Sequence, residues 1–304
     1  MRTLSFTVTQ DQAGHTLGSL LQTQLGISDS LLARLKRREQ GICLNGQRAY
    51  TTARPLAGDL VQVQIGDDPV KRAPPMAFPL SILYEDPDIL VLNKPSGMAV
   101  HASTRSPGEL TLENALSYYL PPDAAPHPVS RLDRGTTGVM AWAKNGYMHH
   151  RLQALFHTQA LSKSYLALCL GSPPEAHGHI QLPIGFAPGS RYQRAVVPVG
   201  QAAHTEYLLL GRRGTLSLVR LLPHTGRTHQ LRVHMASIGC PLAGDWLYGT
   251  EDPTLIARPA LHSHRLTLIH PITGDALNLT APPPEDLIRL FPDLASLPEE
   301  KLLV

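Results

Sequence analysis

One stretch of the chain, residues 127–145 (HPVSRLDRGTTGVMAWAKN), combines residue types that could perform nucleophilic chemistry. It places the carboxylate of Asp133 between Arg131 and Arg134, just before a glycine–threonine turn and an apolar run that predicts a buried strand. A carboxylate that neighbouring arginines hold on a turn can present one ionised nucleophile rigidly. The alternative is a surface turn whose charges only pair with each other, so other residues must decide between the two.

A second charged residue, Arg232, falls in a helical pattern much later in the chain. The second half of residues 223–239 predicts a short helix, because apolar residues recur on one side of it and a glycine follows. Arg232 would lie beside this apolar side, where a lone charge is very costly. It therefore needs an anionic partner, and Asp133 is the obvious candidate.

The elements that must position these residues form a regular pattern after about residue 80. Polar turns separate apolar runs that predict strands at 82–84, 89–93, 163–170, 207–210, 215–222, 261–266 and 276–279. Amphipathic spacing predicts helices over residues 112–119 and 146–160. Tyr165 falls near the start of one predicted strand, and Lys94 begins the loop that follows another.

The N-terminal part of the chain predicts a separate, compact unit of helices and strands. Helical spacing covers residues 16–25, and Ser28 is a plausible N-cap for a second helix. A strand that enters an Asn-Gly turn follows, and then an alternating strand over residues 60–65. The end of the second helix carries four basic residues, Arg34, Lys36, Arg37 and Arg38. We expect domains at 1–68 and 80–304, joined by a proline-rich linker at 69–79.

Bulk composition sets the class of protein. The 304 residues are enough for two domains, and 42% hydrophobic residues can form a substantial core. The three cysteines lie far apart and suggest no disulfide framework, which fits a reducing cytosol. We find no signal peptide or membrane-spanning run, so we expect a cytoplasmic protein. We also expect a monomer, because no exposed apolar zipper is evident. Residues 1–75 hold 9 basic and 6 acidic residues, so all of the net charge of +3 lies there.

The N-terminal unit resembles a known RNA-binding module. Its order of helix, basic helix, G-x-x-x-NG and GD-x-V-x-V resembles the S-four-like RNA-binding domain, over about fifty residues. The resemblance implies that Arg34, Lys36, Arg37 and Arg38 bind RNA phosphates. A solvated, charged helix end is the alternative for each of these side chains.

Four later segments occur in a fixed order that closely resembles the RluA family of RNA pseudouridine synthases. They are EDPDILVLNKPSGMAVH, HPVSRLDRGTTGVMAWAKN, KSYLALC, and HTGRTHQLRVHMASIGCPLAGDWLYG with LHSHRLTLIHP after it. The resemblance implies an α+β fold with a mixed, mainly antiparallel central sheet flanked by helices and loops, behind a small α/β N-terminal domain. The chain departs from the family at Ser130, where histidine is common, which puts a local contact in doubt and not the chemistry.

The resemblance also implies a reaction, the isomerisation of uridine to pseudouridine without cofactor or metal. Asp133 matches the essential aspartate, which either attacks the nucleoside covalently or abstracts a sugar proton. Arg232 matches the basic residue that pairs with this aspartate and favours its ionised form. Tyr165 matches the tyrosine that stacks on the target base and assists the final deprotonation.

Chemistry on a base within a helix requires that its nucleotide be extruded. The resemblance implies that Arg131 occupies the vacated place or holds the flipped nucleotide, and a simple salt bridge to Asp133 is the alternative. Arg227, His229 and Lys94 are further candidates to line the site and meet phosphate.

Three other classes of protein fit the sequence less well. A non-catalytic RNA-binding or ribosome-assembly factor would have lost the aspartate or its arginine, and both are present. A zinc hydrolase or deaminase is suggested only by the fifteen histidines, since HExxH and H-x-E with PCxxC are absent. We expect the pairs His149–His150 and His262/His264 at polar surface or strand positions. A serine hydrolase would need the motif G-x-S-x-G, which this sequence lacks.

The N-terminal domain also bears on the choice of RNA substrate. By analogy alone, it favours large-subunit ribosomal RNA over transfer RNA.

Overall fold

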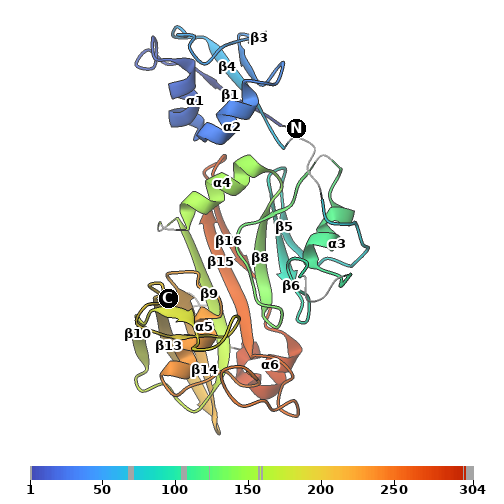
Figure 1. Ribbon diagram of the computed structural model, residues 1–304, viewed down its shortest axis with the longest axis vertical. Coiled ribbons are helices and arrows are strands. Elements are labelled where there is room, and N and C mark those ends of the chain that lie inside the picture. The colour runs from blue at the N-terminus through green and yellow to red at the C-terminus, as the bar shows by residue number, and fades with distance from the viewer. Residues whose placement is uncertain are drawn as a thin grey trace.

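The computed structural model describes residues 2–67, 72–103, 108–122, 124–156, 158, 160–296 and 298. A small N-terminal domain lies at one end of an elongated molecule, and a larger domain built on one long sheet forms the rest (Figure 1). Residues 69–71 of the expected linker lie outside the described residues, and residues 72–79 contain no helix or strand. Within the described part of the chain, no helix is long and apolar enough to cross a membrane.

The N-terminal domain packs two helices against a four-stranded sheet of order β1-β4-β2-β3. Its elements are β1 Arg2–Thr7, α1 Leu17–Leu25, α2 Asp29–Leu35, β2 Ile42–Leu44, β3 Gln47–Arg48 and β4 Leu60–Ile65. Ser28 caps α2 as predicted, because its side chain accepts the Leu31 N–H. The turn after β2 has positive φ at Asn45 and Gly46, as its Asn-Gly sequence requires. Strand β1 was not anticipated from the sequence.

The basic helix end is shorter than predicted. Helix α2 ends at Leu35, so the basic residues 36–38 lie in the turns that follow it. Beyond these turns the chain returns to the helix at Gly41, where a Cβ would come within 2.1 Å of the Leu35 carbonyl oxygen. The chain therefore folds back against the last turn of α2 instead of extending it.

The larger domain is organised by a sheet with strand order β10-β13-β14-β9-β15-β8-β6-β5, with β16 beside β15 and β7 beside β8. The pairing of β15 with β8 is parallel and the other pairings are antiparallel, so the predicted α+β class with a mixed, mainly antiparallel sheet is confirmed. Its strands are β5 Ile82–Glu85, β6 Ile89–Lys94, β7 His127–Pro128, β8 Thr137–Ala143, β9 Leu161–Leu170, β10 His177–Ile180, β13 Thr205–Arg213, β14 Leu216–Pro223, β15 Leu261–Ile269 and β16 Ala276–Thr280.

The remaining elements flank this sheet. A separate hairpin consists of β11 Ile184–Phe186 and β12 Arg194–Val196. The helices are α3 Leu112–Tyr119, α4 Gly146–Leu155, α5 Gln230–Ser237 and α6 Glu285–Leu290, with a 3-10 helix at Pro292–Ser296. Helix α4 was predicted to reach residue 160 but ends at Leu155, and residues 157 and 159 lie outside the described residues.

Strand β8 lies in the centre of the larger domain and is buried on both faces. Met140 and Trp142 pack into one core cluster, while Val139 and Ala141 pack into another on the opposite face. At the start of the strand, Gly138 has φ 105°, and a Cβ there would meet the Ser263 carbonyl oxygen at 2.1 Å. Only glycine allows β8 to lie this close to β15. This contact fixes the strand that directly follows the Asp133 loop.

The two domains meet at α4. The Tyr147 side chain, which α4 contributes, packs with the N-terminal core, and its hydroxyl donates to the Leu25 carbonyl over 2.7 Å. Arg151 donates to the same carbonyl oxygen over 3.0 Å. A further contact joins the domains at β7, where Asp67 Oδ2 of the N-terminal domain lies 2.8 Å from His127 Nε2. These contacts hold the N-terminal domain against the larger one.

Candidate active site

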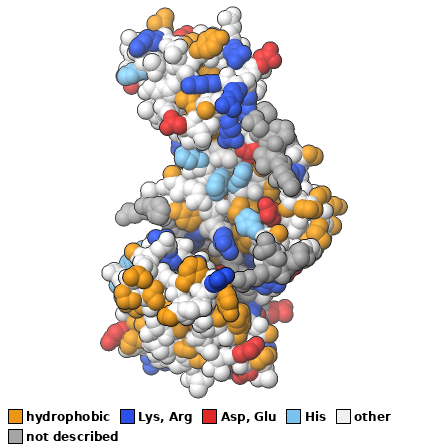
Figure 2. Space-filling view, in the orientation of Figure 1, with side chains coloured by type: hydrophobic (Ala, Val, Ile, Leu, Met, Phe, Trp, Pro, Cys, Tyr) orange, Lys and Arg blue, Asp and Glu red, His pale blue; other side chains and the backbone are white. Residues whose placement is uncertain are grey.

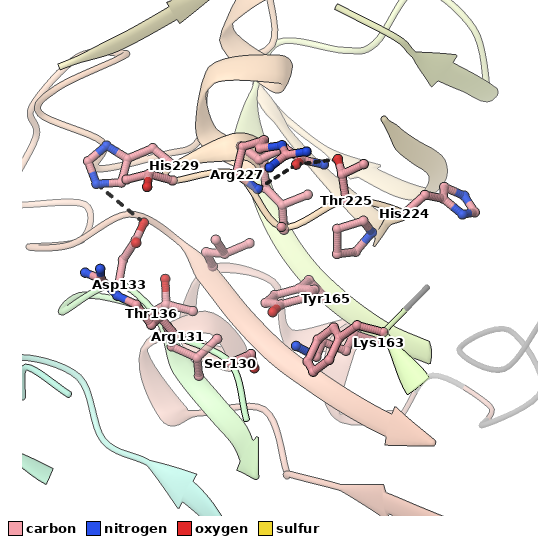
Figure 3. A pocket seen from close by; sticks show the side chains of 18 of the residues that line it. Ser130, Arg131, Asp133, Thr136, Lys163, Tyr165, His224, Thr225, Arg227 and His229 are labelled. Atoms are coloured by element: carbon pink, nitrogen blue, oxygen red, sulfur yellow. Dashed lines mark hydrogen bonds and ion pairs between the residues drawn. The ribbon is translucent and has the colours of Figure 1, made fainter. Parts of the chain in front are cut away.

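An open pocket of about 400 Å³ lies where the Asp133 loop, the start of β9 and the segment between β14 and α5 meet (Figure 3). The residues that line this pocket extend in sequence from Val129 to Leu261. The residues predicted from the sequence that line it are Arg131, Asp133, Tyr165, Arg227, His229 and Arg232. Ser130, the departure from the family pattern, lines it too.

Asp133 presents a partly exposed carboxylate to two nitrogen-bearing side chains. Its Oδ2 atom lies 3.4 Å from Arg232 Nη1 and 3.9 Å from His229 Nε2. The second of these contacts is drawn in Figure 3, where His229 faces Asp133 from across the pocket. The Asp133 carbonyl accepts the Thr136 N–H over 3.0 Å, which closes the turn ahead of β8. The expected proximity of Asp133 and Arg232 is therefore present.

Arg232 has a second and closer anionic partner, Asp245, that we did not predict. Its Nε and Nη2 atoms donate to the two carboxylate oxygens of Asp245, each over 2.7 Å, and both side chains are buried. Burial alone would lower the pKa of Arg232, but the bonds to Asp245 raise it above its ordinary value. The guanidinium beside Asp133 is therefore permanently charged. The only signal for this partner in the sequence is the aspartate of the segment GDWLYG. The Asp245 carboxylate also accepts the N–H groups of Leu247 and Tyr248.

His229 adopts a backbone conformation that most residues avoid. Its φ of 56° and ψ of 18° are left-handed, at the position that precedes helix α5. Such conformations cluster at functional sites, where the surrounding structure fixes them. Its Nδ1 lies 2.7 Å from the Tyr248 hydroxyl, which orients the ring. Burial lowers the pKa of His229, against the opposing effect of the Asp133 charge, so the imidazole is mainly neutral at neutral pH.

Tyr165 lies on β9 with only 7% of its surface exposed, and its ring lines the pocket. Burial raises the pKa of its phenol to about 12, a hydrogen bond with Ser263 opposes that shift, and the Asp133 charge adds to it. The phenol is therefore protonated at neutral pH. Lys163, two residues earlier on the same strand, also lines the pocket, and sequence reasoning missed it. Burial lowers the pKa of Lys163 to about 7, and its Nζ lies 4.1 Å from the centre of the Phe156 ring.

The two predicted RNA-contacting arginines take different positions on the pocket wall. Arg131 is exposed, and among the residues the structure describes no ion pair joins it to Asp133. Arg227 is exposed on the opposite wall, where its Nε donates to the Ala202 carbonyl over 3.0 Å and its Nη1 to Gln201 over 3.2 Å. Both guanidinium groups are thus accessible from the pocket mouth.

Lys94 does not occupy the position expected of a phosphate contact. Its side chain is 1% exposed, and its amine donates to the carbonyls of Pro95, Arg134 and Thr136 over 2.9, 3.0 and 2.9 Å. Burial lowers its pKa to about 8, an effect that the nearby Asp133 charge opposes. Its geometry is that of a buried cross-link that fixes the backbone of the turn after Asp133.

The four basic residues predicted to bind RNA through the N-terminal domain differ in exposure. Lys36 and Arg37 are exposed, whereas Arg38 donates to the Gln64 and Gly66 carbonyls over 3.1 and 2.9 Å. Arg34 lies 3.8 Å from Asp67. Figure 2 shows basic side chains gathered on one side of this domain, over α2. A second, smaller pocket beside α2 includes two residues that were not predicted, Arg48 and Tyr50.

Comparison with known proteins identifies the family. Residues 88–237 match the family model described as RNA pseudouridylate synthase. A protein of Escherichia coli O157:H7 named "Ribosomal large subunit pseudouridine synthase D" is 35% identical over 95% of this chain and 93% of its own. The chain belongs to the RluA family of RNA pseudouridine synthases. The family and the isomerase activity expected from the sequence are therefore confirmed, and a non-catalytic RNA-binding factor is set aside.

Other members of the family extend the comparison. The chain is also 35% identical to "Uncharacterized RNA pseudouridine synthase YjbO" of Bacillus subtilis, over 88% of this chain and 95% of that protein. The solved structure of "Human RNA Pseudouridylate Synthase Domain Containing 4" superposes with a TM-score of 0.58 at 28% identity, over 70% of this chain and 92% of that chain. The shared fold is that of a pseudouridine synthase.

Proposed function

We propose that this pseudouridine synthase modifies uridine in large-subunit ribosomal RNA and that Asp133 is its reactive carboxylate. The observation that supports this most directly is the partly exposed carboxylate of Asp133, 3.4 Å from the buried Arg232 guanidinium, in a pocket that Tyr165 also lines. The proposed RNA follows from relatives in Escherichia coli and Yersinia pestis, which are named for the large ribosomal subunit.

In this proposal Asp133 acts on the ribose of an extruded uridine. It either attacks the nucleoside or removes a sugar proton, and both routes need its ionised form. Arg232 supplies a fixed positive charge without giving up a proton, because Asp245 holds two of its nitrogens. The N-glycosidic bond then breaks, the uracil turns, and its C5 carbon bonds to the sugar before it loses a proton.

Tyr165 contributes through its ring and its protonated hydroxyl. A phenol with a pKa of about 12 is not a resting base at neutral pH, so stacking on the uracil is the main role we assign to it. Arg131, which is not paired with Asp133, holds the flipped nucleotide or fills the place that it leaves. Arg227 and His229 border the opposite wall of the pocket, and we assign Arg227 a phosphate contact.

The N-terminal domain, residues 1–68, serves in this proposal as an S-four-like RNA-binding domain. Residues 69–79 link it to a catalytic domain over residues 80–304. Lys36 and Arg37 are its exposed phosphate ligands, with Arg48 added from the structure, while Arg38 maintains the fold. A ribosomal RNA substrate implies a cytoplasmic enzyme, and we propose that it acts as a monomer.

Mapping of pseudouridines in a deletion strain tests this proposal. The strain is complemented with the wild-type chain or with Asp133→Asn, and both ribosomal and transfer RNA are sequenced for pseudouridine. We expect sites in large-subunit ribosomal RNA that disappear on deletion and return only with the wild-type chain. Sites lost from transfer RNA alone would overturn the proposed substrate, and restoration by Asp133→Asn would overturn the proposed role of this residue.

A further inference from the structure

Four histidines and a glutamate, from segments up to 47 positions apart, gather at the β10 edge of the main sheet. We call this group the histidine cluster, and it consists of His177, His179, His204, Glu206 and His224. His224 also lines the rim of the active-site pocket, where Figure 3 shows it beyond Thr225. Only His224 belongs to the family segments quoted above; the other four residues of the cluster lie outside them.

The register of the sheet brings the cluster together. Strands β10 and β13 are antiparallel with His179 opposite Glu206, and His177 lies two residues earlier on the same face of β10. His204 directly precedes β13, and its carbonyl accepts the N–H of His224, which directly follows β14. Three neighbouring strands thus each contribute to one small region of the surface.

The distances within the cluster are those of a ligand set. His179 Nδ1 lies 3.0 Å from His204 Nε2, and the rings of His204 and His224 stack with centres 4.2 Å apart. One ligand nitrogen each from His179, His204 and His224 lies within 4.8 Å of the other two. Neighbouring nitrogens around a tetrahedral zinc ion, with bonds of about 2.0–2.1 Å, lie about 3.3 Å apart.

The two carboxylate oxygens of Glu206 complete the arrangement. Oε1 lies 3.0 Å from His177 Nε2 and Oε2 lies 3.2 Å from His224 Nε2. A carboxylate bonded to one ring nitrogen orients the other toward a metal, and it also increases the basicity of the ligand. The same carboxylate argues against a phosphate ligand, because a phosphate group here would face the negative charge of Glu206.

The chemistry of the donor atoms indicates the class of metal. Neutral imidazole is the form that binds a metal, and imidazole nitrogens suit zinc, copper and nickel.

We propose that the histidine cluster binds one divalent transition-metal ion of the zinc class through His179, His204 and His224, with Glu206 orienting the imidazole of His224. The sequence led us to expect no metal, and this site lies outside the residues assigned to the isomerisation. The ion joins β10 to the ends of β13 and β14 that meet at the pocket rim. Because the His204 N–H donates to Thr225 Oγ1 over 2.9 Å, the ion also stabilises the segment that carries Arg227.

Zinc titration of the purified, tag-free full chain tests this proposal. After treatment with a chelator and its removal, Zn²⁺ binding is measured by calorimetry, and Co²⁺ is added separately for its visible absorption. We expect one ion per chain, the absorption bands of nitrogen-coordinated cobalt, and a higher Tm with zinc. Glu206→Gln should weaken binding about 10–100-fold.

Variants of the proposed ligands distinguish a specific site from nonspecific zinc binding. His179→Asn changes an exposed side chain and should fold normally, and together with His224→Asn it should abolish the stoichiometric site. His150→Asn, an exposed histidine on α4, is the matched control and should bind zinc as the wild type does. No zinc binding by the wild type, or equal binding by the double variant, overturns the proposal. RNA affinity that rises in mild acid through the cluster, without zinc binding, also overturns it and points to a protonated phosphate-binding patch.

Discussion

Arg232 binds Asp245 through two hydrogen bonds of 2.7 Å and offers Asp133 only its remaining nitrogen, at 3.4 Å. The arginine thus has a buried counterion of its own. Asp133, whose side chain is 31% exposed, can move toward a substrate without leaving a buried charge unpaired. The positive charge beside the reactive carboxylate is therefore fixed before the RNA binds.

Asp245→Asn tests this support. The change leaves Arg232 buried with Asp133 as its nearest carboxylate, and loss of one partner of a buried pair costs about 3–5 kcal/mol. We expect a large loss of stability in urea unfolding and a lower kcat, because Arg232 no longer has a fixed position. Asp252→Asn, which changes a partly exposed aspartate bonded to Thr254, should leave kcat unchanged. Equal effects of the two variants would contradict the role of Asp245.

Lys94→Met distinguishes a buried cross-link from a phosphate contact. It removes three hydrogen bonds to backbone carbonyls, so we expect a loss of about 1–3 kcal/mol in stability and a lower kcat. RNA affinity should keep its dependence on salt. Lys36→Met should do the reverse, with unchanged stability and a salt slope reduced by about 1. A reduced salt slope in Lys94→Met would restore the phosphate role.

Tyr165 substitutions separate stacking from hydroxyl chemistry. Tyr165→Phe keeps the ring and should bind RNA nearly as well as the wild type, with slower turnover. Tyr165→Ala should weaken binding by about 1–3 kcal/mol, because it removes a stacking surface. RNA binding by filter retention and single-turnover rates measure the two effects. Equal loss of binding in both variants would argue against stacking.

Local patterns in the sequence predicted the fold well. Ser28 as an N-cap, the Asn-Gly turn and the apolar runs of the main sheet depend on neighbouring residues, which the sequence displays directly. Gly41 was expected to terminate α2, but the helix already ends at Leu35, because residues 36–40 fold back in turns that only the folded chain reveals.

The candidate site was predictable only in part, because its charges have competing partners. A buried arginine in the helix required an anion, and the sequence indicated Asp133, whereas the closer partner in the structure is Asp245. Lys94 resembled a loop-end charge, although its amine turns inward to three carbonyls. The histidine cluster depends on the register of three strands, which spacing along the chain does not encode.

The pH dependence of stability should reflect His262, a buried histidine on β15. Burial lowers its pKa from 6.5 to about 4, so the unfolded chain binds a proton more readily than the folded chain between these values. Its contribution to stability is complete above pH 6.5 and falls by up to about 3 kcal/mol as the pH drops toward 4. In His262→Gln this part of the acid loss should be absent, which urea unfolding across that range measures. Parallel curves for both proteins would contradict the expected shift.

The role of Asp133 is tested most directly by single-turnover assays of purified Asp133→Asn, with RNA that carries tritium at uridine C5. The change preserves size, so unfolding and RNA binding should match those of the wild type. Because the reaction releases the C5 proton, tritium release reports the isomerisation, and we predict that its rate falls by at least about 10³-fold. A variant that retains more than about a tenth of the wild-type rate, a difference of less than about 1.4 kcal/mol, would contradict Asp133 as the reactive carboxylate.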